Sequence, residues 1–271
     1  MEEKDWSKKD WSKMNFPNAK ALILNISASE YFLPPFMQSM HKLEVLMIFN
    51  HNTKRARIKG ILVFSSLSQL KFVQLEGVIV PPLQEYCHSW QQLEKLSFIL
   101  CEGLDNMTPL HINFPCLLEF SIDHCSNLEE LPASICEMTS VKRLSVTNCH
   151  EIQKLSDDIE KLSLLERLRL YACPSLKELP SSICKLGKLE FLDISLCQSI
   201  KQLPDDLGQL SSLITLDMRE CSHVRQIPRS ACDLRSLKRV ICDERIQRQW
   251  AQIIGSCKVE VAEEYFNLDW L

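Results

Sequence analysis

The side chains of this sequence that could do chemistry are its thiols and imidazoles. There are 13 cysteines and 7 histidines, and the adjacent pairs His124–Cys125 and Cys149–His150 place a nucleophile beside a base. No two cysteines have the CxxC spacing of a zinc knuckle. Neither GxxxxGKS/T nor GxGxxG occurs, and there are only 6 glycines, so no phosphate-binding loop is expected. We expect no cofactor and no enzymatic activity, unless a reactive thiol lies outside the structural pattern of the cysteines.

That pattern is an internal repeat of 24 residues. Its consensus, LxxLxLxxCxxLxxLPxxIxxLxx, suits neither an amphipathic helix nor an alternating strand. The early units are degenerate, with spacings of 27 and 23 residues after the second and third starts, which predicts longer loops or irregular coils in the N-terminal third. The units begin at Ala19, Leu43, Leu70, Leu93, Leu117, Val141, Leu165, Leu189, Leu213 and Leu237.

The repeat resembles that of leucine-rich-repeat proteins. Each unit contributes one short strand centred on LxL, with the two leucines turned inward and their neighbours outward. The proline that follows marks extended or turn backbone on the side of the coil opposite the strand. On that side the chain returns to the next unit, and only a helical turn or a 3-10 segment fits. We therefore predict an α/β leucine-rich-repeat solenoid (horseshoe) with a parallel concave sheet, about 9–10 repeats of 24 residues and short helical or 3-10 convex segments.

One position of six successive units is always cysteine. We expect each of these thiols to turn inward and to bond the backbone where the chain leaves the sheet, because a buried turn would otherwise leave polar groups unpaired. Cys136, Cys184 and Cys232 share a second position and are also expected to be packing residues. The six structural ladder cysteines are Cys101, Cys125, Cys149, Cys173, Cys197 and Cys221.

The ends of the chain depart from the repeat. Residues 1–18 are an N-terminal arm or linker in which KDWSK occurs twice, at 4–8 and 9–13. Two interpretations are open for it, an amphipathic contact arm using Trp6 and Trp11, or a solvated linker, which we favour. Residues 19–242 form the solenoid. Residues 243–271 form the C-terminal cap, with a helix over 243–254 and a strand beyond it.

The outward positions of the strands define a candidate protein-binding face. Arginine and aromatic residues are enriched at interface hot spots, and several gather on neighbouring strands. The alternative is a mutually neutralising solvated face. A second row, Lys177, Lys201 and Arg225, lies just past the strands and is a candidate contact for an acidic partner. The candidate partner-binding residues are Arg143, Arg167, Arg169, Tyr171, Phe191, Asp193, Asp217 and Arg219.

Composition limits the cellular compartment and the classes of binding partner that we expect for the protein. The net charge of −4 does not indicate nucleic-acid binding. The apolar runs are far shorter than the roughly 20 residues that a membrane span requires, and the charged N-terminus does not resemble a secretory signal. We expect an intracellular protein with reduced thiols and no direct membrane insertion.

Three segments beside the repeats resemble a known family. FPNAKALILN (16–25), HKLEVLMIFN (41–50) and VEVAEEYFNLDWL (259–271), together with the LPxxIxxL repeats, resemble the C-terminal leucine-rich-repeat domain of plant intracellular nucleotide-binding immune receptors (NLRs). The resemblance is to the helper class, which has a coiled-coil N-terminus of the mildew-resistance type.

The resemblance implies a non-catalytic domain that holds a nucleotide-binding switch inactive and takes part in activation with lipase-like immune heterodimers. It implies a cytoplasmic location and, within a full receptor, also the nucleus or the plasma membrane. This sequence has neither the nucleotide-binding motifs nor the pore-forming domain, so by itself it should neither bind ATP or ADP nor permeabilise membranes. The alternative is a stand-alone leucine-rich-repeat scaffold or adaptor, in signalling or as the substrate-binding part of a ubiquitin ligase.

Overall fold

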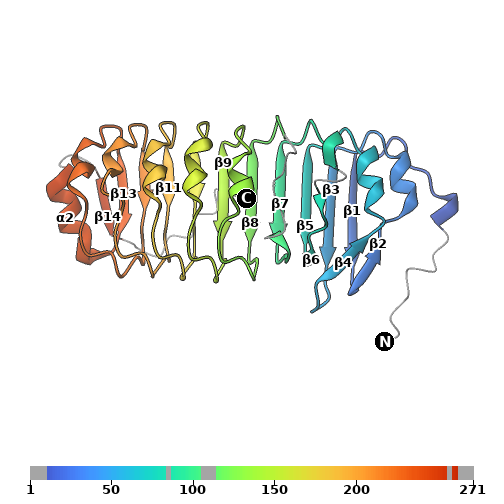
Figure 1. The fold of residues 1–271 in the computed structure, drawn as a ribbon, viewed down its shortest axis with the longest axis horizontal. Helices are drawn as coiled ribbons and strands as arrows, with labels where there is room; N and C mark the ends of the chain where they lie inside the picture. Colours follow the sequence, from blue (N-terminus) through green and yellow to red (C-terminus); the bar gives the residue numbers. More distant parts are fainter. Residues whose placement is uncertain (1–10, 84–86, 105–113, 255–257, 262–271) are drawn as a thin grey trace. The chain divides into compact units, whose positions relative to one another are not determined.

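The strands and short helices of the chain fall into two compact units. The computed structural model describes all residues except 1–10, 84–86, 105–113, 255–257 and 262–271 (Figure 1). The first unit comprises residues 1–128 and 132–141, and the second comprises residues 129–131 and 142–271. Both units combine parallel strands with short helical segments, as the repeat predicts.

The first unit contains two parallel sheets. The longer sheet consists of β1 (Ala21–Ile26), β3 (Val45–Asn50), β5 (Phe72–Glu76), β7 (Lys95–Ile99) and β8 (Glu119–Asp123), paired in that order. The helical segments are η2 (Trp11–Lys13), η3 (Pro35–Ser39), η4 (Ile61–Ser66), η6 (Cys87–Ser89) and α1 (Ala133–Cys136).

The second sheet corrects the expectation of irregular coils in the N-terminal third. It consists of β2 (Glu30–Phe32), β4 (Ala56–Lys59) and β6 (Val78–Ile79), which lie after the strands of the longer sheet in the same coils. Tyr31 pairs with Ile58 across it. These three coils have 24, 27 and 23 residues, so the second sheet does not depend on extra length. Its strands form further backbone hydrogen bonds between neighbouring coils, which pair polar groups of the turn.

The second unit is the more regular one. Its strands are β9 (Arg143–Thr147), β10 (Arg167–Arg169), β11 (Phe191–Asp193), β12 (Thr215–Asp217), β13 (Arg239–Cys242) and β14 (Lys258–Val261), all parallel. Its helical segments are η8 (Asp157–Lys161), η9 (Ser181–Lys185), η10 (Leu207–Gln209), η11 (Arg229–Asp233) and α2 (Glu244–Ile254).

The register of these strands follows the sequence repeat. Leu168 on β10 lies opposite Leu144 on β9 and Leu192 on β11, each 24 residues away, and all three are fully buried. Here the core of the second unit is therefore a stack of equivalent leucines, and each coil is stabilised by its neighbours. This confirms the leucine-rich-repeat solenoid with short 3-10 segments.

The helix that the sequence predicts over residues 243–254 is present as α2. Helix α2 buries Ile246 and Trp250, while Ile253 and Ile254 stay half-buried. Strand β14 then extends the sheet by pairing with β13. The aromatic end of the cap, from residue 262 onward, lies outside the described residues.

Candidate interaction surface

The ladder cysteines lie inside the coils. All six are at most 1% exposed, and none is within the reach of solvent. The Sγ of Cys197 lies 2.7 Å from the carbonyl oxygen of Leu170, and that of Cys221 lies 3.1 Å from the carbonyl oxygen of Ile194, each at the end of the preceding strand. Cys101, Cys125 and Cys173 donate to the preceding coil in the same way. The thiols therefore satisfy carbonyl groups where the chain leaves the sheet.

The second set of cysteines is not uniform. Cys136 and Cys184 are buried, as expected of packing residues, whereas Cys232 is exposed, so that expectation is wrong for Cys232. Burial raises the pKa of Cys184 to about 11 and that of Cys242 to about 12. A thiol whose pKa is raised in this way has almost no thiolate at neutral pH and is a poor nucleophile.

We expect thiol reagents to divide the cysteines of the folded chain into two classes. Cys116 and Cys232 should be alkylated quickly because they are exposed, and the ladder cysteines should react only after the chain unfolds. Alkylation with and without denaturant, with the sites located by mass spectrometry, measures this. Rapid alkylation of a ladder cysteine in the folded chain would instead revive the interpretation of that thiol as a reactive nucleophile.

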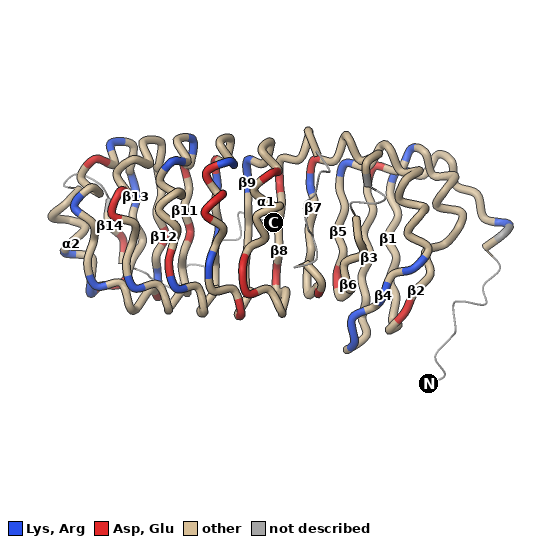
Figure 2. The backbone as a smooth tube through the Cα atoms, viewed as in Figure 1, with Lys and Arg blue, Asp and Glu red and all other residues tan. Residues whose placement is uncertain are grey.

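The outward residues of β9–β12 form what we call the strand face. The guanidinium of Arg167 stacks on the ring of Phe191, with 4.5 Å from Cζ to the ring centroid, and that of Arg169 lies 4.8 Å from the centroid of Tyr171. Arg143 is half-buried on β9, in register with Arg167. Both signs of charge occur along the strands of this unit (Figure 2). The stacked arginines have restricted side chains, so they present fixed donors.

Two residues of the expected face are not exposed. Asp193 and Asp217 are each only 4% exposed, so the expectation that they project into solvent is wrong. Asp193 accepts a 3.1 Å bond from Nε of Arg169, and Asp217 accepts a 2.7 Å bond from a terminal nitrogen of Arg219. Because a carboxylate needs compensation when it leaves water, these aspartates fix the arginines and do not themselves form the contact surface.

The carboxyl of Asp193 has an unusual environment. Burial raises its pKa above the usual range, and the neighbouring charge of Asp217 adds to the shift. Hydrogen bonds from the hydroxyl and amide of Ser195, and the charge of Arg169, act in the opposite direction. The charged form of Asp193 thus depends on its donors, which makes Arg169 a structural residue as well as a surface residue.

Some side chains in and beside the basic row of Lys177, Lys201 and Arg225 already bond to neighbouring residues. Nζ of Lys177 lies 2.7 Å from the side-chain oxygen of Gln153, and Nζ of Lys154 lies 2.7 Å from a carboxylate oxygen of Glu130. Lys201 and Arg225 are exposed. Such exposed charges contribute little individually. The row is therefore a weaker candidate than the strand face.

In the described part of the chain, no group of three or more His, Cys, Asp or Glu side chains could hold a metal ion. Within the same residues, no helix has the length and apolar content needed to cross a bilayer.

Comparison with known proteins gives one partial family match and several close relatives. Residues 133–215 match the model for Zer-1-like leucine-rich repeats. The chain is 56% identical, over 265 residues, to a probable disease resistance protein of Arabidopsis thaliana, covering 95% of this chain and 32% of that protein. It is 39% identical to Disease resistance protein ADR1 of the same plant, over 53% of this chain and 18% of that protein.

The chain thus has leucine-rich repeats and is similar in sequence to disease resistance proteins of Arabidopsis thaliana. This leucine-rich-repeat chain spans only about a third of the length of the first relative and about a fifth of the second. Among solved structures it resembles the leucine-rich repeat domain of the type III effector XopL, with a TM-score of 0.65 and 19% identity over 91% of this chain and 77% of that one. At 19% identity, the likeness to the XopL domain concerns the fold alone.

Proposed function

We propose that this leucine-rich-repeat domain is the protein-interaction part of a plant immune receptor of the helper class. In this role it recognises partners and holds the nucleotide-binding switch of the same receptor inactive, and it has no catalytic function. The similarity to disease resistance proteins, which extends over 95% of this chain, supports the proposal. The greater length of that relative leaves room for a switch and a coiled-coil N-terminus. We place the receptor in the cytoplasm, and at the plasma membrane or in the nucleus when complete.

The observation that carries the proposal is the ordered arginine cluster of the strand face. Arg167 is stacked on Phe191, and Arg169 is held between Tyr171 and the buried Asp193. A side chain that is already ordered loses less rotamer freedom when a partner binds. Fixed arginines and aromatic rings are also the residues on which binding energy concentrates. The face therefore suits a folded protein partner, either the switch domain or a lipase-like heterodimer.

The partner-binding test should avoid the arginines that neutralise buried aspartates. We expect the double variant Arg143→Glu/Arg167→Glu to bind the nucleotide-binding region of the proposed receptor at least tenfold more weakly than wild type does, a loss of about 1.4 kcal/mol or more. The measurement is titration calorimetry with the full chain. The matched control is Lys185→Glu/Arg229→Glu, which makes the same charge change at exposed positions of η9 and η11.

The outcomes separate the candidate functions. Loss of binding in the strand-face variant alone, with an unchanged circular dichroism spectrum, supports both the partner and the face. Equal loss in both variants indicates a nonspecific charge effect. If wild type does not bind the nucleotide-binding region at all, autoinhibition through this contact is contradicted, and the stand-alone scaffold becomes the better interpretation.

A further inference from the structure

Charged side chains on neighbouring coils of the second unit pair with charges of opposite sign. Nζ of Lys142, just before β9, lies 2.9 Å from a carboxylate oxygen of Glu166, just before β10. Arg169 on β10 is paired with Asp193, which lies directly opposite it on β11. Such pairs are expected, because opposite charges stabilise neighbouring strands whereas like charges directly opposite each other destabilise them. In-register positions that carry like charges therefore need a physical reason.

Two in-register pairs of the strand face carry like charges. Asp193 and Asp217 lie opposite each other, and each accepts a bond from an arginine of the chain. Arg143 and Arg167 lie opposite each other on β9 and β10, and we call them the arginine pair. Both are half-buried, so their charges are screened less than charges on an open surface. The arginine pair is complementary to a group that carries two negative charges.

The geometry of the arginine pair suits hydrogen bonding to one anionic group. The stack on Phe191 uses the flat face of the Arg167 guanidinium, whereas its N–H groups donate in the plane of the fork. Neighbouring parallel strands lie about 4.8 Å apart, so two long arginine side chains on adjacent strands can flank the same anion. Ser145 is half-buried on the same side of β9 as Arg143, and it adds a hydroxyl donor.

The number of charges selects the chemical class of this anion. A carboxylate has a single negative charge and would leave one of the two arginine charges without compensation. A phosphorylated side chain carries about −1.5 to −2 charges at pH 7 and has three strong acceptor oxygens. Two guanidinium forks match such a group in charge and in geometry. Clusters of arginines are also a recurring way in which proteins bind phosphorylated segments of other proteins.

The surroundings of the arginine pair indicate that a protein carries the phosphate. The rings of Phe191 and Tyr171 are half-buried on the same face and offer apolar contact area close to the pair. A free phosphate ion would use none of this area, whereas the residues on either side of a phosphorylated residue would pack on it. The strand face therefore combines an anion site with the contact area that a peptide segment needs.

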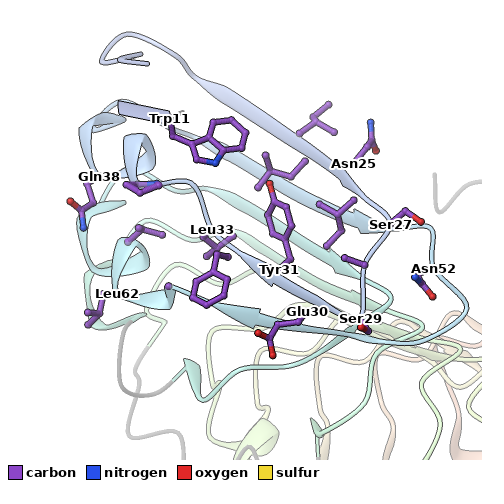
Figure 3. Close-up of a pocket in the computed structure, with 18 residues that line it drawn as sticks. Trp11, Asn25, Ser27, Ser29, Glu30, Tyr31, Leu33, Gln38, Asn52 and Leu62 are labelled. Atoms are coloured by element: carbon purple, nitrogen blue, oxygen red, sulfur yellow. The ribbon is translucent and has the colours of Figure 1, made fainter. Parts of the chain in front are cut away.

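The cavity of the first unit is not a competing site for such an anion. It has a volume of about 980 Å³ and lies among β1, β2, η3 and η4 (Figure 3). Its described lining residues carry one charge, the carboxylate of Glu30, which would repel a phosphate. Trp11 also lines this cavity, with its ring 5.4 Å from the ring of Phe36. The interpretation of residues 11–18 as a solvated linker therefore does not hold for Trp11.

We propose that Arg143 and Arg167 bind a phosphorylated serine, threonine or tyrosine side chain of a protein partner, with Ser145 as a further donor. This inference rests on the proposed function because it places the partner on the strand face. It adds that phosphorylation of the partner controls the contact. The unmodified segment presents a neutral hydroxyl to two positive charges, and modification converts that hydroxyl into a dianion.

The experiment compares the retention of two peptide pools on the immobilised full chain. In the first pool the central residue is phosphoserine, phosphothreonine or phosphotyrosine, and the flanking positions are randomised. The second pool is identical except that the central residue is not phosphorylated, and both are added at equal concentration. Mass spectrometry quantifies the retained peptides. We expect the phosphorylated pool to be retained about tenfold more than the unmodified pool.

A lysine variant tests whether the guanidinium forks matter beyond their charge. Arg143→Lys/Arg167→Lys keeps both positive charges but removes the planar, bidentate donors. It should retain the phosphorylated pool several-fold less than wild type does. The matched control is Arg229→Lys/Arg235→Lys, which makes the same change at exposed arginines of η11 and of the loop after it. This control should retain the phosphorylated pool as well as wild type does.

Three results would overturn the inference. The first is equal retention of the two pools by wild type. The second is an equal loss of retention in the two lysine variants, which would indicate a nonspecific charge effect. The third is complete displacement of the phosphorylated pool by inorganic phosphate at the same concentration. That result would assign the arginine pair to a small free anion and not to a protein partner.

Calorimetry with the nucleotide-binding region of the proposed receptor separates this inference from the proposed function. If that region binds through the strand face and the phosphorylated pool is not preferred, the proposed function is supported and the phosphate inference is contradicted. If the phosphorylated pool is preferred and the region does not bind, the phosphate inference is supported and autoinhibition through this contact is contradicted.

Discussion

Replacement of Trp250 by alanine is expected to lower the free energy of unfolding by about 3–5 kcal/mol, the range for a large aromatic side chain removed from a core. Trp250 is fully buried against the last coils, together with Ile246 of the same helix. In a solenoid the loss of packing in one coil also weakens the adjacent coils, because each coil depends on its neighbours. Urea denaturation followed by far-UV circular dichroism measures the change without relying on tryptophan fluorescence.

The control for this prediction lies on the same helix. Gln252 is exposed on α2, and Gln252→Ala should change the free energy of unfolding by no more than about 0.5 kcal/mol. If the two substitutions had equal effects, α2 would be a peripheral helix and a stabilising role of Trp250 in the core would be contradicted.

The repeated core could be predicted from the sequence because it depends on apolar spacing alone. The 24-residue register places Leu144, Leu168 and Leu192 opposite one another, as the alignment of units requires. The ladder cysteines followed from the same register. Periodicity of this kind is informative because the coils are equivalent and each one packs in the same way.

Two features of the backbone could not be predicted because no residue type marks them. The three-stranded sheet of the first unit has strands of only two to four residues, too short for an alternating pattern. The residue before each ladder cysteine has a φ between 50° and 61°, yet none of the six is glycine. Ala172 and Leu196, for example, are held in this left-handed region by the turn that directs the cysteine inward.

The candidate face was predicted only in part, for a similar reason. Strand alternation correctly placed Arg167, Arg169 and Phe191 on the outward side. It could not show that Asp193 would be covered, because that burial results from side chains of the neighbouring strand and from Ser195. The alternation of residues along a strand predicts which way a side chain points. Whether that side chain is buried depends on the side chains of the adjacent coils that cover it.

The environment of Asp193 leads to a pH-dependent prediction for Arg169. We expect Arg169→Ala to lower the free energy of unfolding at pH 7 by about 3 kcal/mol, the lower end of the range for breaking a buried ion pair. The lower end applies because the side chain of Arg169 is 19% exposed, so water can partly replace it. Other charges that act on Asp193 include Asp217, which repels it, and Arg219, which is engaged with Asp217.

The loss of unfolding free energy caused by Arg169→Ala should become smaller as the pH is lowered. The folded-state pKa of Asp193 is already raised by burial, and removing Arg169 raises it further, because the charge of Arg169 lowers it. A carboxyl with a raised folded-state pKa contributes stability below its unfolded pKa, and that contribution disappears as the pH rises through the folded value. The variant should therefore lie closer to wild type at about pH 4.5 than at pH 7, since protonated Asp193 needs no cation.

Urea denaturation of wild type and variant at both pH values tests this, with Arg167→Ala as the control. Arg167 stacks on Phe191, so its removal should cost about 0.5–1 kcal/mol, with a smaller change between the two pH values than for Arg169→Ala. A difference between Arg169→Ala and wild type that stayed constant with pH would show that Arg169 stabilises the coil through packing on Tyr171 and not through the charge of Asp193. In that case, a partner with an acidic surface could engage Arg169 without disturbing the buried carboxylates.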